Sequence, residues 1–391
     1  MADLKAGEPF GLDPTLIAKI DWPLALKRIA QDVRTDFIYA PHLAFIYSKA
    51  GDELVAGLKS ELKAGTFSPG VPITIEVPKS FRIRVTAKAR RLGPNFSRPG
   101  SILLPKDRLL YQALADQAVP IIKKNTDDDR SFSYKLASPE SASMFLPTRK
   151  CWSALQKRLA ELSKNKAYRY IIKLDVANFF GSLNQHILIN VLNDSGYPKP
   201  LHSRLEAMLT AYTGDRNSRG ILQGIYPSDL FGNYYLAPID KFFNETGVPS
   251  ARYVDDFYLF LANMDAADRL LRELIPLLRS YDLVLNEAKS AIMPKSALMS
   301  EEPDLEALFS AAVEEISEQV DGEDFDADYG FQSDWEDESE ENEDEEDEDE
   351  EDLELKATML LFDSIDEYPG NEENIERFCL RYFPRRVRIM L

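Results

Sequence analysis

The stretch Arg252-Tyr-Val-Asp-Asp-Phe257 sets two adjacent carboxylates inside an apolar and aromatic run that extends to Phe260. Glycine and proline precede this run and an asparagine follows it, so the pattern predicts a β-hairpin with Asp255 and Asp256 at its turn. Two neighbouring carboxylates in such surroundings repel each other unless a cation neutralises them. The pair therefore indicates a cation site, although acids at strand ends are also common as simple loop residues.

A third acid ends a second apolar stretch. The β-rich run over 167–176 contains Ile172-Lys-Leu-Asp175, and a carboxylate at the end of a buried strand does not serve packing. Three such acids are typical of sites where two Mg²⁺ ions, about 3.5–4 Å apart, support in-line nucleotidyl transfer. The chain has only 2 cysteines and 3 histidines, none clustered, so oxygen ligands are expected, and with them Mg²⁺ or its substitute Mn²⁺.

Four segments resemble the palm motifs A, B, C and D of reverse transcriptases in order and separation. They are Ile172–Phe180, Leu222–Ser228, Arg252–Phe257 and Leu285–Lys289. Upstream, Arg98–Arg108 with the Tyr-Gln-Ala-Leu that follows is similar to a fingers motif of bacterial reverse transcriptases. Within the family, the chain is most similar to bacterial abortive-infection and other defence-associated reverse transcriptases of the unknown groups. Retron reverse transcriptases are the nearest competitor.

The resemblance implies roles for the three acids. Asp175 and Asp255 would be metal ligands, with the Val176 carbonyl as a backbone ligand. Asp256 would be the second acid of the turn.

The resemblance also implies a nucleotide-binding set. Phe180 falls at the steric-gate position, where an aromatic ring crowds a ribose 2′-hydroxyl, so deoxynucleotides would be used. Gln223 and Gly224 would lie against the incoming nucleotide, because a glycine allows close backbone approach. Arg98 would grip the triphosphate, and Lys289 would protonate the leaving pyrophosphate.

Several of these assignments have simpler alternatives. Either Phe179 or Phe180 could be a core residue, and a Gln-Gly pair alone is usually a turn. Ser228 belongs to the same motif as that pair, and Lys88 or Arg91 could supply a second cation for the triphosphate. The basic stretch that holds these cations could also be an ordinary solvated face.

The expected architecture is α+β, with the fingers and palm of a right-hand polymerase and an antiparallel palm sheet. The expected domains are a helical N-terminal extension at 1–70, fingers at 71–166, a palm at 167–300, an acidic and largely disordered segment at 301–352, and a helical C-terminal piece at 353–391. The C-terminal piece resembles the first of the HEAT-like helices that follow the thumb in the defence-associated enzymes, and it could be the start of a domain that this chain does not complete. Apolar periodicity predicts helices over 13–64, 108–124, 186–192, 202–212, 227–243 and 266–280, and strands over 71–77 and 282–289.

Charge is divided unevenly along the chain. The formal net charge is −20, from 46 basic and 66 acidic residues, yet residues 301–352 hold 28 acids and no Lys or Arg. Residues 1–300 contain 40 basic and 31 acidic residues, a net of +9, which suits a nucleic-acid partner. The acidic segment could be a solvated tether, an intramolecular competitor for the basic groove, or a docking tail for a basic partner.

These observations predict a Mg²⁺-dependent DNA polymerase of the reverse transcriptase family, either RNA-directed or template-independent, that serves bacterial antiphage defence by abortive infection. The expected partners are deoxynucleoside triphosphates, an RNA or DNA strand and a non-coding RNA, with a homo-oligomer left open. The chain begins without a signal peptide and has no membrane-length apolar run, so a cytoplasmic protein is expected. The alternatives are a retron-type enzyme that copies a dedicated RNA, and a binding or regulatory protein on a silent polymerase scaffold.

Overall fold

The computed structural model describes residues 8–35, 38, 40–78, 97–146, 148–214, 218–298, 358, 359, 362 and 379. These fall into two compact units, the first being Met1–Val77 with Pro99–Met299 and the second Pro78–Arg98 with Ser300–Leu391. In the second unit, the Cys379 thiol is buried and donates to the Thr358 carbonyl at 3.5 Å. The acidic segment and nearly all of the expected C-terminal helical piece lie outside the described residues.

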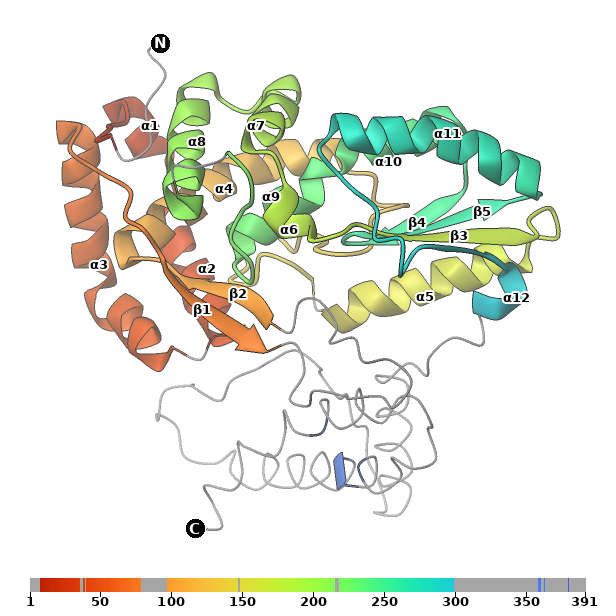
Figure 1. Ribbon diagram of the computed structural model, residues 1–391. Coiled ribbons are helices and arrows are strands. Elements are labelled where there is room, and N and C mark those ends of the chain that lie inside the picture. The colour runs from red at the N-terminus through yellow and green to blue at the C-terminus, as the bar shows by residue number, and fades with distance from the viewer. Residues whose placement is uncertain are drawn as a thin grey trace. The chain divides into compact units, whose positions relative to one another are not determined.

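The first unit contains a four-stranded antiparallel sheet that lies between α11 (Met264–Ser280) and α5 (Thr148–Lys164) (Figure 1). Its strands, in spatial order, are β4 (Ser250–Tyr253), β5 (Asp256–Leu261), β3 (Tyr170–Asp175) and β6 (Ala291–Pro294). The β4–β5 hairpin predicted from the sequence is confirmed, with Val254 and Asp255 in its turn.

Alternating side chains on the two inner strands belong to two different cores. Ile172 and Leu174 of β3 pack in one cluster with the helix α11, while Ile171 packs in a second cluster with α5. On β5, Phe257 and its alternates join the first cluster, and Tyr258 and Phe260 join the second. The sheet is therefore covered on both faces, with α11 and α5 on opposite sides (Figure 1).

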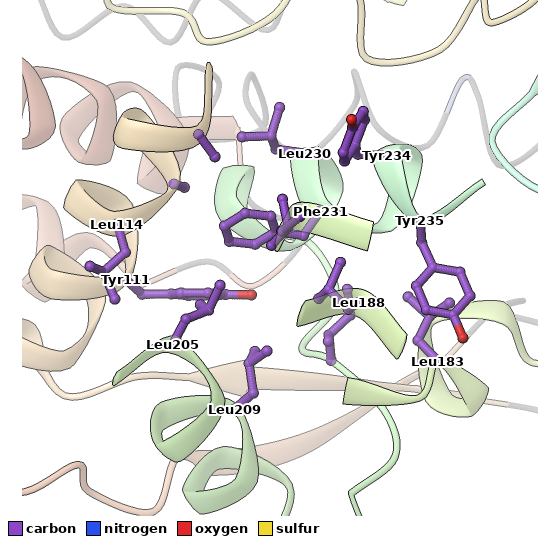
Figure 2. Packing of buried hydrophobic residues seen from close by; sticks show 14 of the residues in the cluster. Tyr111, Leu114, Leu183, Leu188, Leu205, Leu209, Leu230, Phe231, Tyr234 and Tyr235 are labelled. Atoms are coloured by element: carbon purple, nitrogen blue, oxygen red, sulfur yellow. The ribbon is translucent and has the colours of Figure 1, made fainter. Parts of the chain in front are cut away.

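Four helices beside the sheet build the larger apolar core. They are α4 (Pro105–Asn125), α7 (Gln185–Asp194), α8 (Lys199–Thr213) and α9 (Tyr226–Tyr235). Figure 2 shows Tyr111 and Leu114 of α4 facing Leu205 and Leu209 of α8 and Phe231 of α9. Full burial of each such large side chain contributes about 1.5–3 kcal/mol to the free energy of unfolding. The cluster therefore holds α9 firmly, and with it the end of the loop that precedes this helix.

The prediction of a single helix over 227–243 is wrong, because the structure has two helices there. After α9 ends, α10 (Ala237–Glu245) begins with Pro238 in its first turn. A proline has no backbone N–H and its ring clashes with the carbonyl four residues earlier, so α9 cannot continue through it.

The strand expected over 282–289 is also wrong. Asp282 has a left-handed φ of 55°, and the Asn286 carbonyl accepts hydrogen bonds from the backbone N–H groups of Lys289 and Ser290. The segment is therefore a turn that touches the sheet through one bridge between Val176 and Leu285, and the strand β6 follows it.

The helices expected over 13–64 are confirmed, and they are α1 (Pro14–Lys19), α2 (Trp22–Thr35) and α3 (Pro41–Ala64). The remaining elements are the paired strands β1 (Ile73–Pro78) and β2 (Ser97–Ile102) and the short helices α6 (Phe179–Ser182) and α12 (Lys295–Leu298). A buried ion pair of 2.9 Å between Arg108 and Asp32 joins α4 to α2. The same Asp32 carboxylate accepts from the backbone N–H of Tyr226 at 3.1 Å, so α2 also holds the start of α9.

Candidate active site

The two strands that carry the three acids are neighbours in the sheet. Asp175, the last residue of β3, pairs in register with Asp256, the first residue of β5, and Asp255 lies in the adjoining turn. Asp175 is 9% exposed. The structure therefore gathers three carboxylates from two distant segments at one end of the sheet.

Val254, directly before these acids, has a backbone conformation that is unusual for its type. Its φ is 53°, in the left-handed region that a β-branched side chain rarely adopts. Both of its backbone polar groups are held: its N–H donates to the Ser133 hydroxyl at 2.8 Å, and its carbonyl accepts from Arg252 Nη1 at 3.2 Å. Side chains from outside the turn therefore maintain a conformation that would otherwise relax.

Arg252 is the centre of the buried network behind this turn. Its guanidinium pairs with both carboxylate oxygens of Asp240 at 2.7–2.9 Å and donates to the Asn233 side-chain oxygen at 2.6 Å. That same oxygen accepts from the hydroxyls of Ser131 and Ser133 at 3.3 and 3.1 Å. Sequence reasoning missed the role of these residues, since only Arg252 lay inside a recognised motif and none of their spacings indicates a shared site.

The acids leave excess negative charge at the site. Burial, which is the largest cause, and the negative charges of Asp256 and Asp175 together raise the pKa of Asp255 from 3.8 to about 6, while Lys289 opposes the shift. The Lys289 Nζ lies 3.4 Å from Asp175 Oδ1, so an ion pair offsets part of the negative charge of the acids. A carboxyl under such repulsion is a group that a bound cation would stabilise in its ionised form.

The carboxylates at this end of the sheet provide oxygen ligands of the kind that Mg²⁺ prefers. Within the described part of the chain, no group of three or more His, Cys, Asp or Glu side chains is arranged to hold one. Mg²⁺, however, is usually bound through one or two carboxylates, waters and substrate phosphates rather than an all-protein cage. Asp175 and Asp255, beside the buried backbone of Val176, provide the one or two carboxylates that such a Mg²⁺ site needs.

Phe180 lies half-buried in α6, next to the buried ring of Phe179 at a centroid distance of 5.3 Å. Phe179 is thus the core residue of the pair. A Cβ on Gly232 would come within 2.7 Å of Phe180 Cε1, so only a glycine in α9 leaves room for this ring. The Phe180 carbonyl accepts from the Ile221 N–H at 2.9 Å, which ties the ring's backbone to the loop before α9.

That loop carries the Gln-Gly pair. Gln223 and Gly224 are both half-buried, and Gly224 has a φ of 82°, where a side chain would be strained. Ser228, in the helix that follows, is fully buried and shares a hydrogen bond of 3.1 Å with the Tyr111 hydroxyl. Ser228 therefore anchors α9 to α4.

The cations expected at the triphosphate are only partly visible. The backbone of Arg98 belongs to β2, while its side chain lies outside the description. Lys88 and Arg91 also fall outside the described residues.

Comparison with known proteins identifies the family. Residues 92–303 match the family described as reverse transcriptase (RNA-dependent DNA polymerase), over more than half of the chain. The chain belongs to the reverse transcriptase family, and the matched region is a nucleotidyltransferase domain of the RNA-directed DNA polymerase kind. No curated protein matches.

Solved structures of telomerase show similarity to this chain. Apo telomerase from Candida tropicalis has 14% identity over 63% of this chain and 50% of its own, with a TM-score of 0.38. Telomerase from Candida albicans with a TWJ fragment of telomeric RNA has 11% identity over 64% and 46%, with a TM-score of 0.37. The chain thus spans about half the length of these structures.

No helix in the described ranges is long and apolar enough to cross a bilayer.

Proposed function

We propose that this chain is a Mg²⁺-dependent polymerase that builds DNA from deoxynucleoside triphosphates on an RNA template. The observation that carries this proposal is the meeting of Asp175, Asp255 and Asp256 at one end of the sheet, within a region that matches the reverse transcriptase family. Buried carboxylates whose mutual repulsion raises a pKa are suited to bind divalent cations.

The residues of the site divide the work of the reaction. Asp175, Asp255 and the Val176 carbonyl would hold the metal, with Asp256 as the second acid of the turn. When bound, Mg²⁺ supplies electrostatic stabilisation of the charge that develops on the transferred phosphate. Lys289, on the same side as Asp175, would give a proton to the leaving pyrophosphate.

The nucleotide would be selected by the elements around the acids. The Phe180 ring would exclude a ribose 2′-hydroxyl, and the loop with Gln223 and Gly224 would lie against the base and sugar. Arg98 would contact the triphosphate from the fingers. In this proposal the fingers occupy 71–166 and the palm 167–300, preceded by the helical extension at 1–70.

The test is incorporation of radiolabelled deoxynucleotides with the full chain. Asp255→Asn with Asp256→Asn should abolish incorporation on a primed RNA template, while circular dichroism stays unchanged. The control is Asp265→Asn with Asp268→Asn, which removes two exposed acids from α11 and should leave activity intact. Wild-type activity in the first variant would refute the metal assignment.

Template use is settled by the same assay. The proposal expects product to depend on the RNA template and on a primer hydroxyl. Product made equally well without template would replace it by template-independent addition, and a protein attached to the product would identify a protein hydroxyl as primer. A wild-type chain that makes no product under any of these conditions would favour a silent scaffold.

We further propose that the enzyme serves antiphage defence in the bacterial cytoplasm and acts with a non-coding RNA. The support is the resemblance of the Leu104-Pro-Lys-Asp-Arg108 run and of the helical extension to defence-associated reverse transcriptases. Expression of the wild-type chain should lower phage plaque counts, and the Asp255→Asn, Asp256→Asn variant should not. Equal plaque counts for both chains would contradict this role.

A further inference from the structure

The two helices that cover the palm sheet have the same length and unlike charge. Both α5 and α11 contain 17 residues and pack an apolar stripe on the sheet, from opposite faces. The sequence of α11 has three acidic and three basic residues, whereas α5 has five basic residues and only Glu161 as an acid. Since both helices meet the same demand for packing, the excess charge of α5 is not explained by the fold.

The basic residues of α5 that point to solvent form one row. Lys150, Lys157 and Lys164 are exposed and recur every seven residues, so they lie along one line on the face opposite the buried Leu155 and Leu159. At 1.5 Å per residue the row is about 21 Å long. Because the other side of α5 is packed in the second core, the row is displayed on a rigid support.

Two more exposed cations follow the row in the loop after the helix. Lys166 and Arg169 lie in the loop that joins α5 to β3, and the loop is fixed by Lys295, whose Nζ donates to the Asn165 carbonyl at 2.8 Å. No ion pair joins Lys150, Lys157, Lys164, Lys166 or Arg169 to an acid among the residues described. Their positive charges therefore remain available to a partner.

The row starts beside the candidate active site. Near the N-terminal end of α5, the Trp152 ring packs edge-on against Tyr253 at 5.1 Å, and Tyr253 pairs with Asp256. Just beyond the other end, Tyr168 packs against Phe260 at 6.3 Å, far along β5 from the turn. The row thus leads from the three acids toward the opposite end of the sheet.

We propose that the exposed row Lys150, Lys157, Lys164, Lys166 and Arg169 binds the phosphate backbone of the RNA–DNA duplex as it leaves the active site. This inference rests on the proposed function, because that reaction produces such a duplex. A row of cations neutralises phosphates without reading sequence.

The choice of a duplex over a single strand follows from what the row lacks. Surfaces that bind single strands stack the bases on exposed aromatic rings. The outward face of α5 is lined by Lys150, Ser153, Lys157, Glu161 and Lys164, and its only aromatic residue, Trp152, packs on Tyr253. Charge without a stacking platform suits a duplex, whose bases are already stacked.

The experiment measures binding of a fluorescein-labelled RNA–DNA hybrid by anisotropy, without nucleotide or Mg²⁺, over a series of KCl concentrations. The variant is Lys150→Gln with Lys157→Gln and Lys164→Gln. We expect its affinity to fall by about tenfold to a hundredfold, and the slope of log affinity against log salt to decrease by about two to three. The control is Arg269→Gln with Arg272→Gln and Arg279→Gln, which removes three exposed cations from α11 and should bind like the wild type.

Three outcomes would overturn the inference. The first is an unchanged affinity and salt slope in the α5 variant, and the second is an equal loss of hybrid affinity in the α11 control. The third is a loss of affinity only for a labelled polyglutamate probe, which would assign the row to an acidic protein. A single-stranded RNA probe bound as tightly as the hybrid, with the same loss, would also reject the duplex. Because hybrid binding is measured without nucleotide and without Mg²⁺, while catalysis is measured by incorporation, failure of the row and failure of the proposed catalysis are distinguishable.

Discussion

The backbone N–H of Val254 donates a hydrogen bond to the hydroxyl of Ser133, 2.8 Å away and 121 residues earlier in the chain. Ser133 lies in the loop after α4, and Val254 forms the turn that holds Asp255. This contact makes the geometry of the turn that holds Asp255 depend on a segment outside the strands of the sheet. A left-handed β-branched residue costs roughly 1–2 kcal/mol, which is comparable to what one such hydrogen bond contributes.

Ser133→Ala should weaken catalysis more than nucleotide binding. Without the hydroxyl acceptor, Val254 can relax toward a negative φ and carry Asp255 with it, so we expect kcat to fall about tenfold, equivalent to about 1.4 kcal/mol, with a smaller change in KM. Steady-state incorporation kinetics measure the two constants. Ser131→Ala is the matched control, because Ser131 also donates to Asn233 but does not contact Val254. Equal losses in both variants would assign the effect to Asn233 instead.

Gly232→Ala should alter sugar discrimination through Phe180. The added Cβ would lie 2.7 Å from the Phe180 ring, which must then move toward the nucleotide or away from its neighbour Phe179. We expect the KM for deoxynucleotides to rise several-fold and the ratio of deoxynucleotide to ribonucleotide use to change. The double variant with Phe180→Ala removes the clash and should behave like Phe180→Ala alone. If the two substitutions add independently, the ring is not the cause.

Asp107→Asn should stabilise the protein at neutral pH. Burial raises the pKa of Asp107 from 3.8 to about 6, although the N–H of Gly70 and the hydroxyl of Tyr212 donate to its Oδ1 and lower it. Between about pH 4 and 6 the unfolded chain has lost this proton while the folded chain retains it, so the free energy of unfolding falls as pH rises through that window.

Because Asn retains the accepting oxygen, the variant should unfold at neutral pH with about 2 kcal/mol more free energy than the wild type. The difference should shrink below pH 4, where both chains carry a neutral group. Urea denaturation at a series of pH values measures this. Glu61→Gln tests a nearby acid whose charge also raises the pKa of Asp107, and it should reproduce only a small part of the effect. A stability gap that does not vary with pH would contradict this account.

Lys289→Gln should lower kcat, since it removes the cation 3.4 Å from Asp175 and the proposed proton donor. Lys289→Arg keeps the charge but donates a proton far less readily. Rapid-quench measurement of the rate of the chemical step separates these functions. If only the charge of Lys289 matters, the rate should recover in the Arg variant, and if Lys289 donates a proton, the rate should fall in both variants. Normal rates in both variants would remove Lys289 from the site.

Three of the four strands of the sheet, β3, β4 and β5, could be predicted from the sequence, because apolar runs that stop abruptly at acids mark them, whereas β6 was not predicted. Asp175 and Asp255 were therefore found by local patterns alone. The division of the expected helix at Pro238 was missed because apolar residues on both sides continued the helical spacing. The turn at Asn286 was missed because its defining hydrogen bonds join backbone groups and leave no pattern in side-chain type.

The support behind the site was beyond local reasoning for a different reason. Ser133, Asn233 and Asp240 are separated widely in sequence, and each is an ordinary polar residue in its own segment. Their role arises only when α9, α10 and the loop after α4 pack around Arg252. Tertiary contacts of this kind carry no periodic signal.

The pairing of Asp175 with Asp256 joins positions 81 residues apart, with five helices, α6 to α10, and the strand β4 between them. Closing so long a loop is entropically costly, and contacts of this separation tend to form late in folding. During synthesis, the two acids cannot meet until β5 has left the ribosome. A nascent or truncated chain that ends before Asp255 should therefore already possess much of its helical core while lacking two of the three carboxylates, so folding of the helices would begin before the proposed metal site can form.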